Sequence, residues 1–485
     1  MAEIDAIVVG SGPNGLAAAV TLARAGLKVV VYERNSTIGG GSRTAELTLP
    51  GFMHDVCSAV HPMALASGFF RRFQLDQRIE LSVPEVSYGH PLDGGRAGIA
   101  WRDIDRTAAG LGVDGPAWKQ LMGPLAAHAN RVAQFTGSQL LQVPRHPLTV
   151  AAFGLRVLEQ GLPTWNLRFR EDAAPAMLTG VAAHSIRPMP SLSTAAAALS
   201  LGTYAHARGW PIPIGGSQSI VDALADDLRA HGGEIVTDTE ITSLDELPDS
   251  TAVLLDVSAK ALLSLVTLPP SYVRRVERFT FGNAVAKVDF ALSGPVPWTN
   301  TDLRRAGTLH VGGTRAEIAA SEADVAAGRH SANPYVLVAQ PSIADPGRAP
   351  AGAHVLWAYT HVPRNSPLDQ TEAVTKQIER FAPGFRDLVL ASSSLTAQDM
   401  QNHNPNYVGG DIASGTASVR QLLARPVLST EPWRTPAPGV YLCSSSTPPG
   451  PGVHGLPGYY AARSALEHEF GITAAPSLAI QTPAS

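Results

Sequence analysis

The chain has 485 residues, 45% of them hydrophobic, and a formal net charge of -4 at pH 7. This charge gives no reason to expect a nucleic-acid partner, and no apolar run approaches the ~20 residues of a membrane-spanning helix. The two cysteines, Cys57 and Cys443, form no CxxC pair, so neither a metal site nor disulfide chemistry is expected. The length of the chain predicts two domains. We expect a cytoplasmic location, because a strand rather than a signal peptide opens the chain.

The first forty residues predict a dinucleotide-binding unit. A buried strand over 4–9 leads into a glycine turn and a helix of small residues, and a second buried strand ends at Glu33. Gly10 makes the turn, Gly12 lets the backbone approach a pyrophosphate, and Gly15 lets the helix lie close on the sheet. A carboxylate at Glu33 would accept hydrogen bonds from a ribose diol and repel a 2'-phosphate, which favours FAD or NAD over NADP. The proposed nucleotide-binding residues of the turn are Gly10, Ser11, Gly12, Pro13, Asn14 and Gly15.

A second glycine cluster follows directly after Glu33. Its glycines permit close approach to a ligand, and Arg43 can offer its donor fork to a phosphate or a ring oxygen. The alternative is an exposed turn. The candidate ligand-binding residues here are Arg34, Gly40, Gly41, Ser42 and Arg43. The next passage, 51–62, has small residues and two histidines and is typical of a loop under a ring system.

From about 69 to 209 the pattern changes to longer helices with loops rich in Pro and Gly. Apolar residues recur at helical spacing over 148–158, at Leu148, Phe153, Leu155 and Leu158. The simpler interpretation is an amphipathic helix packed on a globular core. The alternative is a lid or a membrane-surface contact that serves an apolar substrate.

Helix and strand alternate again from about 210 to 274, so the nucleotide domain is predicted to be discontinuous. Strands are expected over 234–237, 240–244 and 252–256. A mixed domain is expected over 275–425, beginning with a strand at 284–292. In that strand Lys287 either lines a substrate cavity or pairs with Asp289 or another neighbour on a solvated face. The polar loop 402–411 either closes a site or is a structural turn.

The C-terminal segment predicts a second strand, glycine loop and helix. The strand covers 439–443, the loop runs through Gly450 to Gly458, and the helix is expected from about 459 to 470. A protein needs a second turn of this kind for one dinucleotide only if it must also bind a bulky ring at the far end of that ligand. A helix amino end would place donors and partial positive charge near that ring, which suits a flavin.

These motifs resemble the phytoene-dehydrogenase-like FAD oxidoreductases, relatives of carotenoid desaturases and isomerases in the amine-oxidase-type flavoprotein superfamily. The resemblance rests on IDAIVVGSGPNGLAAAVTLARAGLKVVVYER, IGGGSRT, PIGGSQSIVDAL, AVAKVDFALSGPVPW and LCSSSTPPGPGVHGLPGYYAA. It implies an α/β fold: a discontinuous Rossmann-type, glutathione-reductase-like FAD domain over 1–68, 210–274 and 426–475. A mixed-sheet and helical substrate domain over 69–209 and 275–425 would be interleaved with it, before a flexible tail at 476–485. Further FAD-binding residues implied by the resemblance are Ala59, Ile241, Ser445, Gly452 and Val453.

The implied reaction is transfer of a hydride to flavin N5 from an apolar isoprenoid, lipid or polyketide-like substrate, in desaturation, oxidation or isomerisation. His454 is the first candidate for a proton acceptor, followed by His61 and Lys287, although His454 could instead only bind backbone. His454 replaces the proline usual in carotenoid desaturases. The electron acceptor, oxygen or a quinone, is not identified, and peripheral membrane contact is an open alternative.

Two other functions remain open at this stage. A flavin amine oxidase of the same fold would need an aromatic cage, for which Tyr407, Tyr459 and Tyr460 are candidates. A non-catalytic lipid carrier similar to Rab-escort proteins would not use flavin, and the intact glycine turn and Glu33 argue against it.

Overall fold

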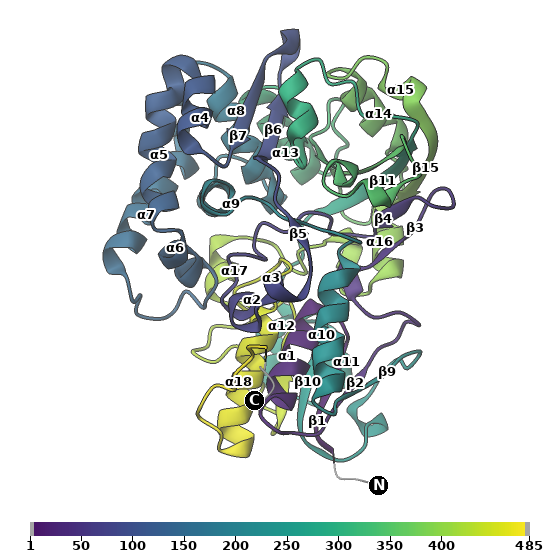
Figure 1. Cartoon of the computed structure of the whole chain (residues 1–485). Helices are drawn as coiled ribbons and strands as arrows, with labels where there is room; N and C mark the ends of the chain where they lie inside the picture. The colour runs from purple at the N-terminus through teal and green to yellow at the C-terminus, as the bar shows by residue number, and fades with distance from the viewer. Residues whose placement is uncertain (1–3, 481–485) are drawn as a thin grey trace, which may run out of the picture.

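A computed structural model describes residues 4–480 of the chain. Two halves are visible, each built around one sheet, and both chain ends lie on the half that contains α1, α10 and α18 (Figure 1). The chain crosses between the halves several times, so segments far apart in the sequence share a sheet. This is the predicted α/β architecture with interleaved parts.

The first half contains a five-stranded, fully parallel sheet in the order β16-β10-β1-β2-β9. Its inner strands are largely apolar because helices cover both faces of such a sheet, whereas the edge strand β9 is mostly exposed. One face packs on α1 (Pro13–Ala23), α10 (Gln218–Ala230) and α18 (Leu456–Phe470), and the other on α11 (Leu262–Leu265) and α12 (Pro270–Glu277). The strands are β1 (Ile4–Val9), β2 (Val29–Tyr32), β9 (Glu234–Val236), β10 (Ser250–Leu255) and β16 (Val440–Leu442).

Two segments of this half differ from expectation. The predicted strand at 240–244 is wrong: the chain there is a loop, in which the Thr242 amide donates to Glu246 Oε2 instead of to a neighbouring strand (3.2 Å). Residues 476–480 of the predicted flexible tail are held in place, since Leu478 is buried and the Ala479 carbonyl accepts from Arg24 (2.9 Å). The remaining tail residues, 481–485, lie outside the described part of the chain.

The second half contains a seven-stranded mixed sheet in the order β15-β11-β14-β13-β12-β6-β7. The expected strand at 284–292 is confirmed as β11 (Ala284–Leu292), and all nine of its residues are buried. It pairs with β14 on one side and β15 on the other, so its polar face meets the protein interior rather than solvent. The other strands are β6 (Val86–Pro91), β7 (Ala97–Trp101), β12 (Thr308–Val311), β13 (Val336–Ala339), β14 (His354–Val362) and β15 (Val389–Leu395).

A helical layer adjoins the β6 and β7 side of this sheet (Figure 1). Its helices are α4 (Ile104–Gly110), α5 (Gly115–Ala127), α6 (Ala129–Thr136), α7 (Pro147–Gly161), α8 (Ala173–Ala182) and α9 (Leu192–Ala207). Within residues 4–480, no helix combines the length and the hydropathy required to cross a bilayer.

Helix α7 differs from an ordinary amphipathic helix on a core. Of its four spaced apolar residues only Phe153 is buried, whereas Leu148 is 86% and Leu155 68% exposed. The inward face of the helix both packs into a hydrophobic core, through Phe153 and Val157, and lines a cavity, through Val150 and the same two residues. The outward leucines therefore leave an uncovered apolar face.

Candidate functional site

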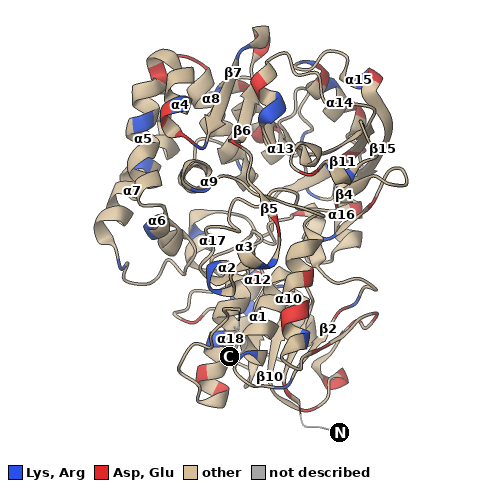
Figure 2. Cartoon of the chain, viewed as in Figure 1, with Lys and Arg blue, Asp and Glu red and all other residues tan. Residues whose placement is uncertain are grey.

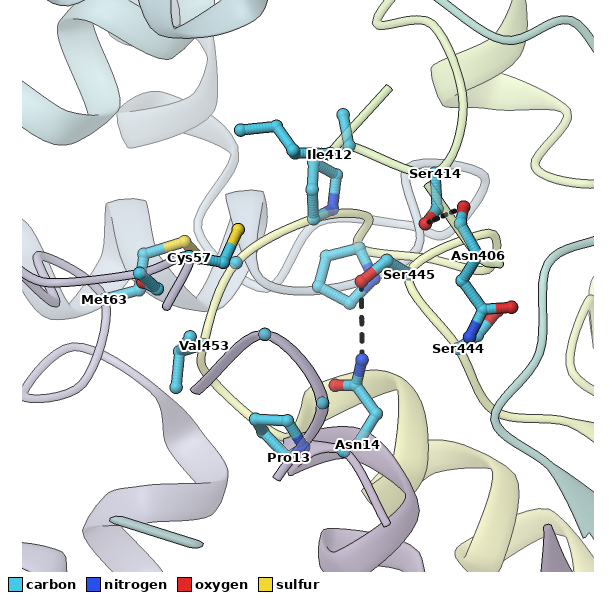
Figure 3. A pocket seen from close by; sticks show the side chains of 18 of the residues that line it. Pro13, Asn14, Cys57, Met63, Asn406, Ile412, Ser414, Ser444, Ser445 and Val453 are labelled. Atoms are coloured by element: carbon cyan, nitrogen blue, oxygen red, sulfur yellow. Dashed lines mark hydrogen bonds between the residues drawn. The ribbon is translucent and has the colours of Figure 1, made fainter. Parts of the chain in front are cut away.

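A cavity of about 1070 Å³ runs between the two halves of the molecule. Segments near both ends of the chain contribute to its wall, because the turn after β1 and the loop after β16 lie side by side there (Figure 3). Its volume is at the upper end for small-molecule sites, as expected for a site that holds a cofactor together with a second ligand. The two predicted turns therefore open into one cavity.

The turn after β1 forms one end of this cavity. Gly10 has φ +101°, a conformation that favours glycine, and a Cβ at Gly15 would lie 2.0 Å from the Gly10 carbonyl oxygen. Glu33 is held at the tip of β2: the Ser11 amide (3.0 Å) and hydroxyl (2.6 Å) donate to Oε2, and the Asn35 amide (2.9 Å) donates to Oε1. The carboxylate is thus fixed beside the turn before any ligand binds.

The second glycine cluster lies directly against the first turn. A Cβ at Gly40 would lie 3.3 Å from the Gly12 Cα, so the backbones of the two segments pack directly against each other with little room for a side chain. Arg43 Nε donates to the Gly40 carbonyl (3.0 Å) and Nη2 contacts Nε2 of His403 (2.9 Å). Burial lowers the pKa of Arg43, although its guanidinium remains charged at neutral pH. The cluster therefore presents backbone and one cation to the cavity.

The loop after β16 contacts the first turn directly. Asn14 Nδ2 donates to Ser445 Oγ (3.4 Å; Figure 3), and a Cβ at Gly458 would lie 1.8 Å from the Asn14 carbonyl oxygen. Helices α1 and α18 can approach this closely only because Gly458 has no side chain. Arg425 is buried and stabilises the loop: its Nε donates to the Ser445 carbonyl (2.8 Å) and its Nη2 to the Ala413 carbonyl (2.9 Å).

The structure places every proposed cofactor-binding residue except Gly15 in the cavity wall. Gly15 lies just beneath, where its amide donates to Asp256 Oδ2 (3.0 Å). The residues in the wall are Gly10, Ser11, Gly12, Pro13, Asn14, Glu33, Arg34, Gly40, Gly41, Ser42, Arg43, Ala59, Ile241, Ser445, Gly452 and Val453.

The three candidate proton acceptors are placed differently from one another. His61 lines the cavity, its Nε2 contacts Ser217 Oγ (2.8 Å), and burial lowers its pKa to about 4. His454 lies outside the wall: Nδ1 accepts from the Leu456 amide (3.2 Å), an arrangement that fits the alternative of backbone support. Lys287 also lies outside the wall: the expected pairing with Asp289 is confirmed, but the pair is buried and does not lie on a solvated face.

Two titratable residues of the wall, Asp256 and His184, are not among the predicted site residues. Asp256 directly follows β10, and burial raises the pKa of this carboxyl to about 7 while the Gly15 amide lowers it. A polar residue at the carboxyl end of a buried parallel strand was the available signal. His184, after α8, had no local signal, because its partner His310 lies 126 residues further along the chain.

The cavity fits a flavin dinucleotide on structural grounds. Asn14 Oδ1 and Ser42 Oγ are buried beside the two glycine segments with no hydrogen-bond partner among residues 4–480. Buried polar atoms are normally paired, so these two atoms call for a ligand. Gly12 and Gly40 lie side by side in the cavity wall without side chains, so a pyrophosphate can approach their backbone closely.

The fold and this cavity define an FAD-binding oxidoreductase. The chain belongs to the family of flavin-containing amine oxidoreductases, whose family model matches residues 14–456. A rat protein named pyridine nucleotide-disulfide oxidoreductase domain-containing protein 2 is 25% identical, over 95% of this chain and 93% of its own length. Through its family, the chain is an FAD-dependent enzyme.

Solved structures show the same fold at low identity. Wild-type putrescine oxidase bound to putrescine superposes with a TM-score of 0.59 at 18% identity, covering 96% of this chain and 98% of that one. Reduced UDP-galactopyranose mutase superposes with a TM-score of 0.55 at 15% identity, covering 99% and 96%. The names of these two neighbours refer to different molecules, putrescine and UDP-galactopyranose. The shared fold therefore does not identify the substrate of this chain.

Proposed function

We propose that the chain is a phytoene-dehydrogenase-like oxidoreductase that oxidises, desaturates or isomerises an apolar substrate. One observation carries this proposal: the cavity continues from the nucleotide end into an arm walled by α6, α7 and α9. Its lining there includes Phe135, Leu140, Val150, Phe153, Val157, Leu192 and Leu201. An arm of this composition favours an isoprenoid, lipid or polyketide-like molecule.

The distribution of charge in the cavity supports the same proposal. Every charged residue that lines the cavity within residues 4–480 belongs to the parallel-sheet half: Glu33, Arg34, Arg43, Glu240 and Asp256. An ammonium group in the apolar arm would have no carboxylate to pair with, and an unpaired buried charge is costly. The arm therefore favours neutral substrates over protonated amines.

The residues of the two turns would hold FAD as follows. The glycine turn and Glu33 would bind the adenosine end, the segment from Gly40 to Arg43 the pyrophosphate side, and Ser445 to Val453 the flavin end. Bound FAD supplies the acceptor for a hydride equivalent from a substrate C–H bond. The protein supplies positioning and exclusion of water, and His61 is the one of the three candidate proton acceptors that lies in the wall.

The amine oxidase alternative has partial support from aromatic side chains. Tyr407 lines the cavity, and its hydroxyl would lie 2.2 Å from a Cβ at Gly41. Tyr459 and Tyr460 are not in the wall; they pack between α18 and its neighbours. A cage of the three predicted tyrosines is thus not assembled; Trp357 and Tyr359 also line the cavity and belong to the same hydrophobic cluster as Tyr407.

Anaerobic bleaching of the yellow FAD absorbance distinguishes these functions. The purified holoenzyme is mixed in separate cuvettes with isoprenoids, fatty compounds and amines under nitrogen. We expect bleaching by a neutral apolar compound. Bleaching by amines alone would replace the proposal with the amine oxidase function.

We propose in addition that the outer face of α7 rests on a lipid surface that delivers the substrate. Leu148, Leu155 and Leu158 are exposed on one face, at spacings of seven and three residues. Most of the α7 ribbon is uncharged (Figure 2), and exposed Arg145 precedes the helix. Because the opposite face lines the apolar arm, a substrate could pass from lipid into the cavity along this helix.

Vesicle binding tests the role of this face. The double substitution Leu148→Ser with Leu155→Ser should weaken co-sedimentation with vesicles of phosphatidylcholine and phosphatidylglycerol by at least about tenfold. The control Leu390→Ser changes an exposed leucine (53%) on the outer strand β15. Equal binding of both variants and the wild type, or no binding by any of them, would rule out this docking face.

A further inference from the structure

A pair of histidines lies in the wall of the cavity on the mixed-sheet side. His184 follows α8 and lines the cavity with its side chain partly exposed, whereas His310 on β12 is fully buried behind it. Their Nε2 atoms are 2.9 Å apart, so they share one hydrogen bond. Burial lowers the pKa of His184 to about 3 and that of His310 well below its usual value, so both rings are neutral.

His310 is fixed by tight packing. Its ring lies 5.2 Å from the ring of Tyr88 and stacks on Tyr335 at 6.3 Å. A Cβ at Gly180 would lie only 2.6 Å from the His310 Cβ, so the helix α8 backbone presses against this side chain. Because His310 is buried and closely packed, its hydrogen bond holds the His184 ring in one orientation.

The remaining nitrogen of His184 is available to a ligand. Nε2 is occupied by His310, and Nδ1 makes no hydrogen bond to any residue within 4–480. The neighbouring wall is largely aromatic and aliphatic: Trp210 lies 5.9 Å from the His184 ring, and the lining also includes Ile186 and Leu337. His184 thus offers an oriented ring nitrogen on a wall that has no charged residue in the described part of the chain, beside the unpaired hydroxyl groups of Ser185 and Thr308.

We propose that His184 is a specificity-determining residue that binds a hydroxyl group on an otherwise apolar substrate. A neutral imidazole nitrogen either donates or accepts one hydrogen bond, and a hydroxyl group can satisfy it in both tautomers. A pure hydrocarbon would leave this nitrogen unpaired, and an ammonium group would find no carboxylate beside it. The inference rests on the proposed function of the cavity, and it narrows the substrate class to oxygen-bearing apolar molecules.

Three ligands of equal shape test this inference: naphthyl ethanol, isopropylnaphthalene and naphthyl ethylamine. They differ only in the hydroxyl, methyl or amino group at one carbon. Their dissociation constants are measured on the FAD-loaded protein from changes in the flavin spectrum and in tryptophan fluorescence, to which Trp210 and Trp357 in the wall contribute. We expect the alcohol to bind about tenfold more tightly than the hydrocarbon, the value of one net hydrogen bond.

The variant His184→Phe keeps an aromatic ring and removes the nitrogen. It should abolish the preference for the alcohol and leave the affinity for the hydrocarbon unchanged, while His184→Gln should retain part of the preference. His128→Gln changes an exposed histidine at the end of α5 and is the matched control. FAD content and melting temperature, measured on each variant, identify any that fails to fold.

The outcomes distinguish a failure of the role of His184 from a failure of the proposed function. Equal affinity of the wild type for alcohol and hydrocarbon, or a preference that survives in His184→Phe, would overturn the role of His184. Preferential binding of the amine would overturn it as well and would favour the amine oxidase function. Failure of every neutral compound to bleach FAD would instead refute the proposed function while the binding preference stands.

Discussion

The close approach of α1 and α18 should make Gly458→Ala severely damaging. The added Cβ would lie 1.8 Å from the Asn14 carbonyl oxygen and 2.9 Å from the Ala18 amide nitrogen. Real Cβ contacts are essentially never shorter than 3.0 Å, so the helices must separate by about 1.2 Å, which is 3.0 minus 1.8. The obstacle is backbone, so no side-chain rotation can relieve it.

The expected cost is about 1–3 kcal/mol from overpacking, reduced by up to ~1 kcal/mol because Ala favours a helix more than Gly. Since the two turns are carried by these helices, FAD retention should fall together with the melting temperature. Both are measured on protein purified in parallel, as FAD per chain and as a thermal unfolding curve.

Gly110→Ala is the matched control for this substitution. Gly110 ends α4, and a Cβ there would meet no atom within 4 Å. Its FAD content should equal that of the wild type, and its stability should be equal or slightly higher. A Gly458→Ala protein that keeps full FAD content and wild-type stability would refute the argument that contact between these helices sets the geometry of the site.

Three further substitutions test other parts of the cofactor site. Glu33→Gln should weaken FAD binding by about tenfold or more, because hydrogen bonds to a charged acceptor are lost. Binding is measured by the fluorescence of released flavin. Glu240→Gln changes an exposed acid in the same wall and should alter FAD binding little. In the FAD-free protein, the raised pKa of Asp256 means that the folded state binds an extra proton between about pH 4 and pH 7, so this group's contribution to stability falls as pH rises through that window. Asp256→Asn should therefore gain stability over the wild type toward pH 7 in urea titrations and show no gain near pH 4, and a pH-independent difference would contradict the assignment. Arg425→Met should lower FAD content and melting temperature, because buried carbonyl groups lose their donor, and an unchanged melting temperature would show that the loop is held by other contacts.

Local sequence patterns predicted the elements whose structure depends on neighbours in the chain. The turn from Gly10 to Gly15 requires small residues at particular positions, and the strand Ala284–Leu292 has apolar residues at every second position, so both could be located from the sequence. The C-terminal glycine loop was also predicted to face the same cavity, because two turns of this kind suit one long ligand.

Features that depend on tertiary contacts could not be predicted in this way. Lys287 has the alternation of a half-exposed strand, yet β14 and β15 bury it from both sides. The leucines of α7 have the spacing of a core-facing helix, but the helix instead separates a cavity from solvent. The His184 and His310 pair exists only because α8 packs beside β12, which no local pattern encodes.

The central claim is that two distant turns grip one flavin dinucleotide. Its most direct test is the amount of FAD that is released from the purified, denatured protein after reconstitution with excess FAD and removal of the unbound cofactor. The account predicts one FAD per chain in the wild type and a marked loss in Gly458→Ala. A wild-type protein that remains colourless after reconstitution would contradict it.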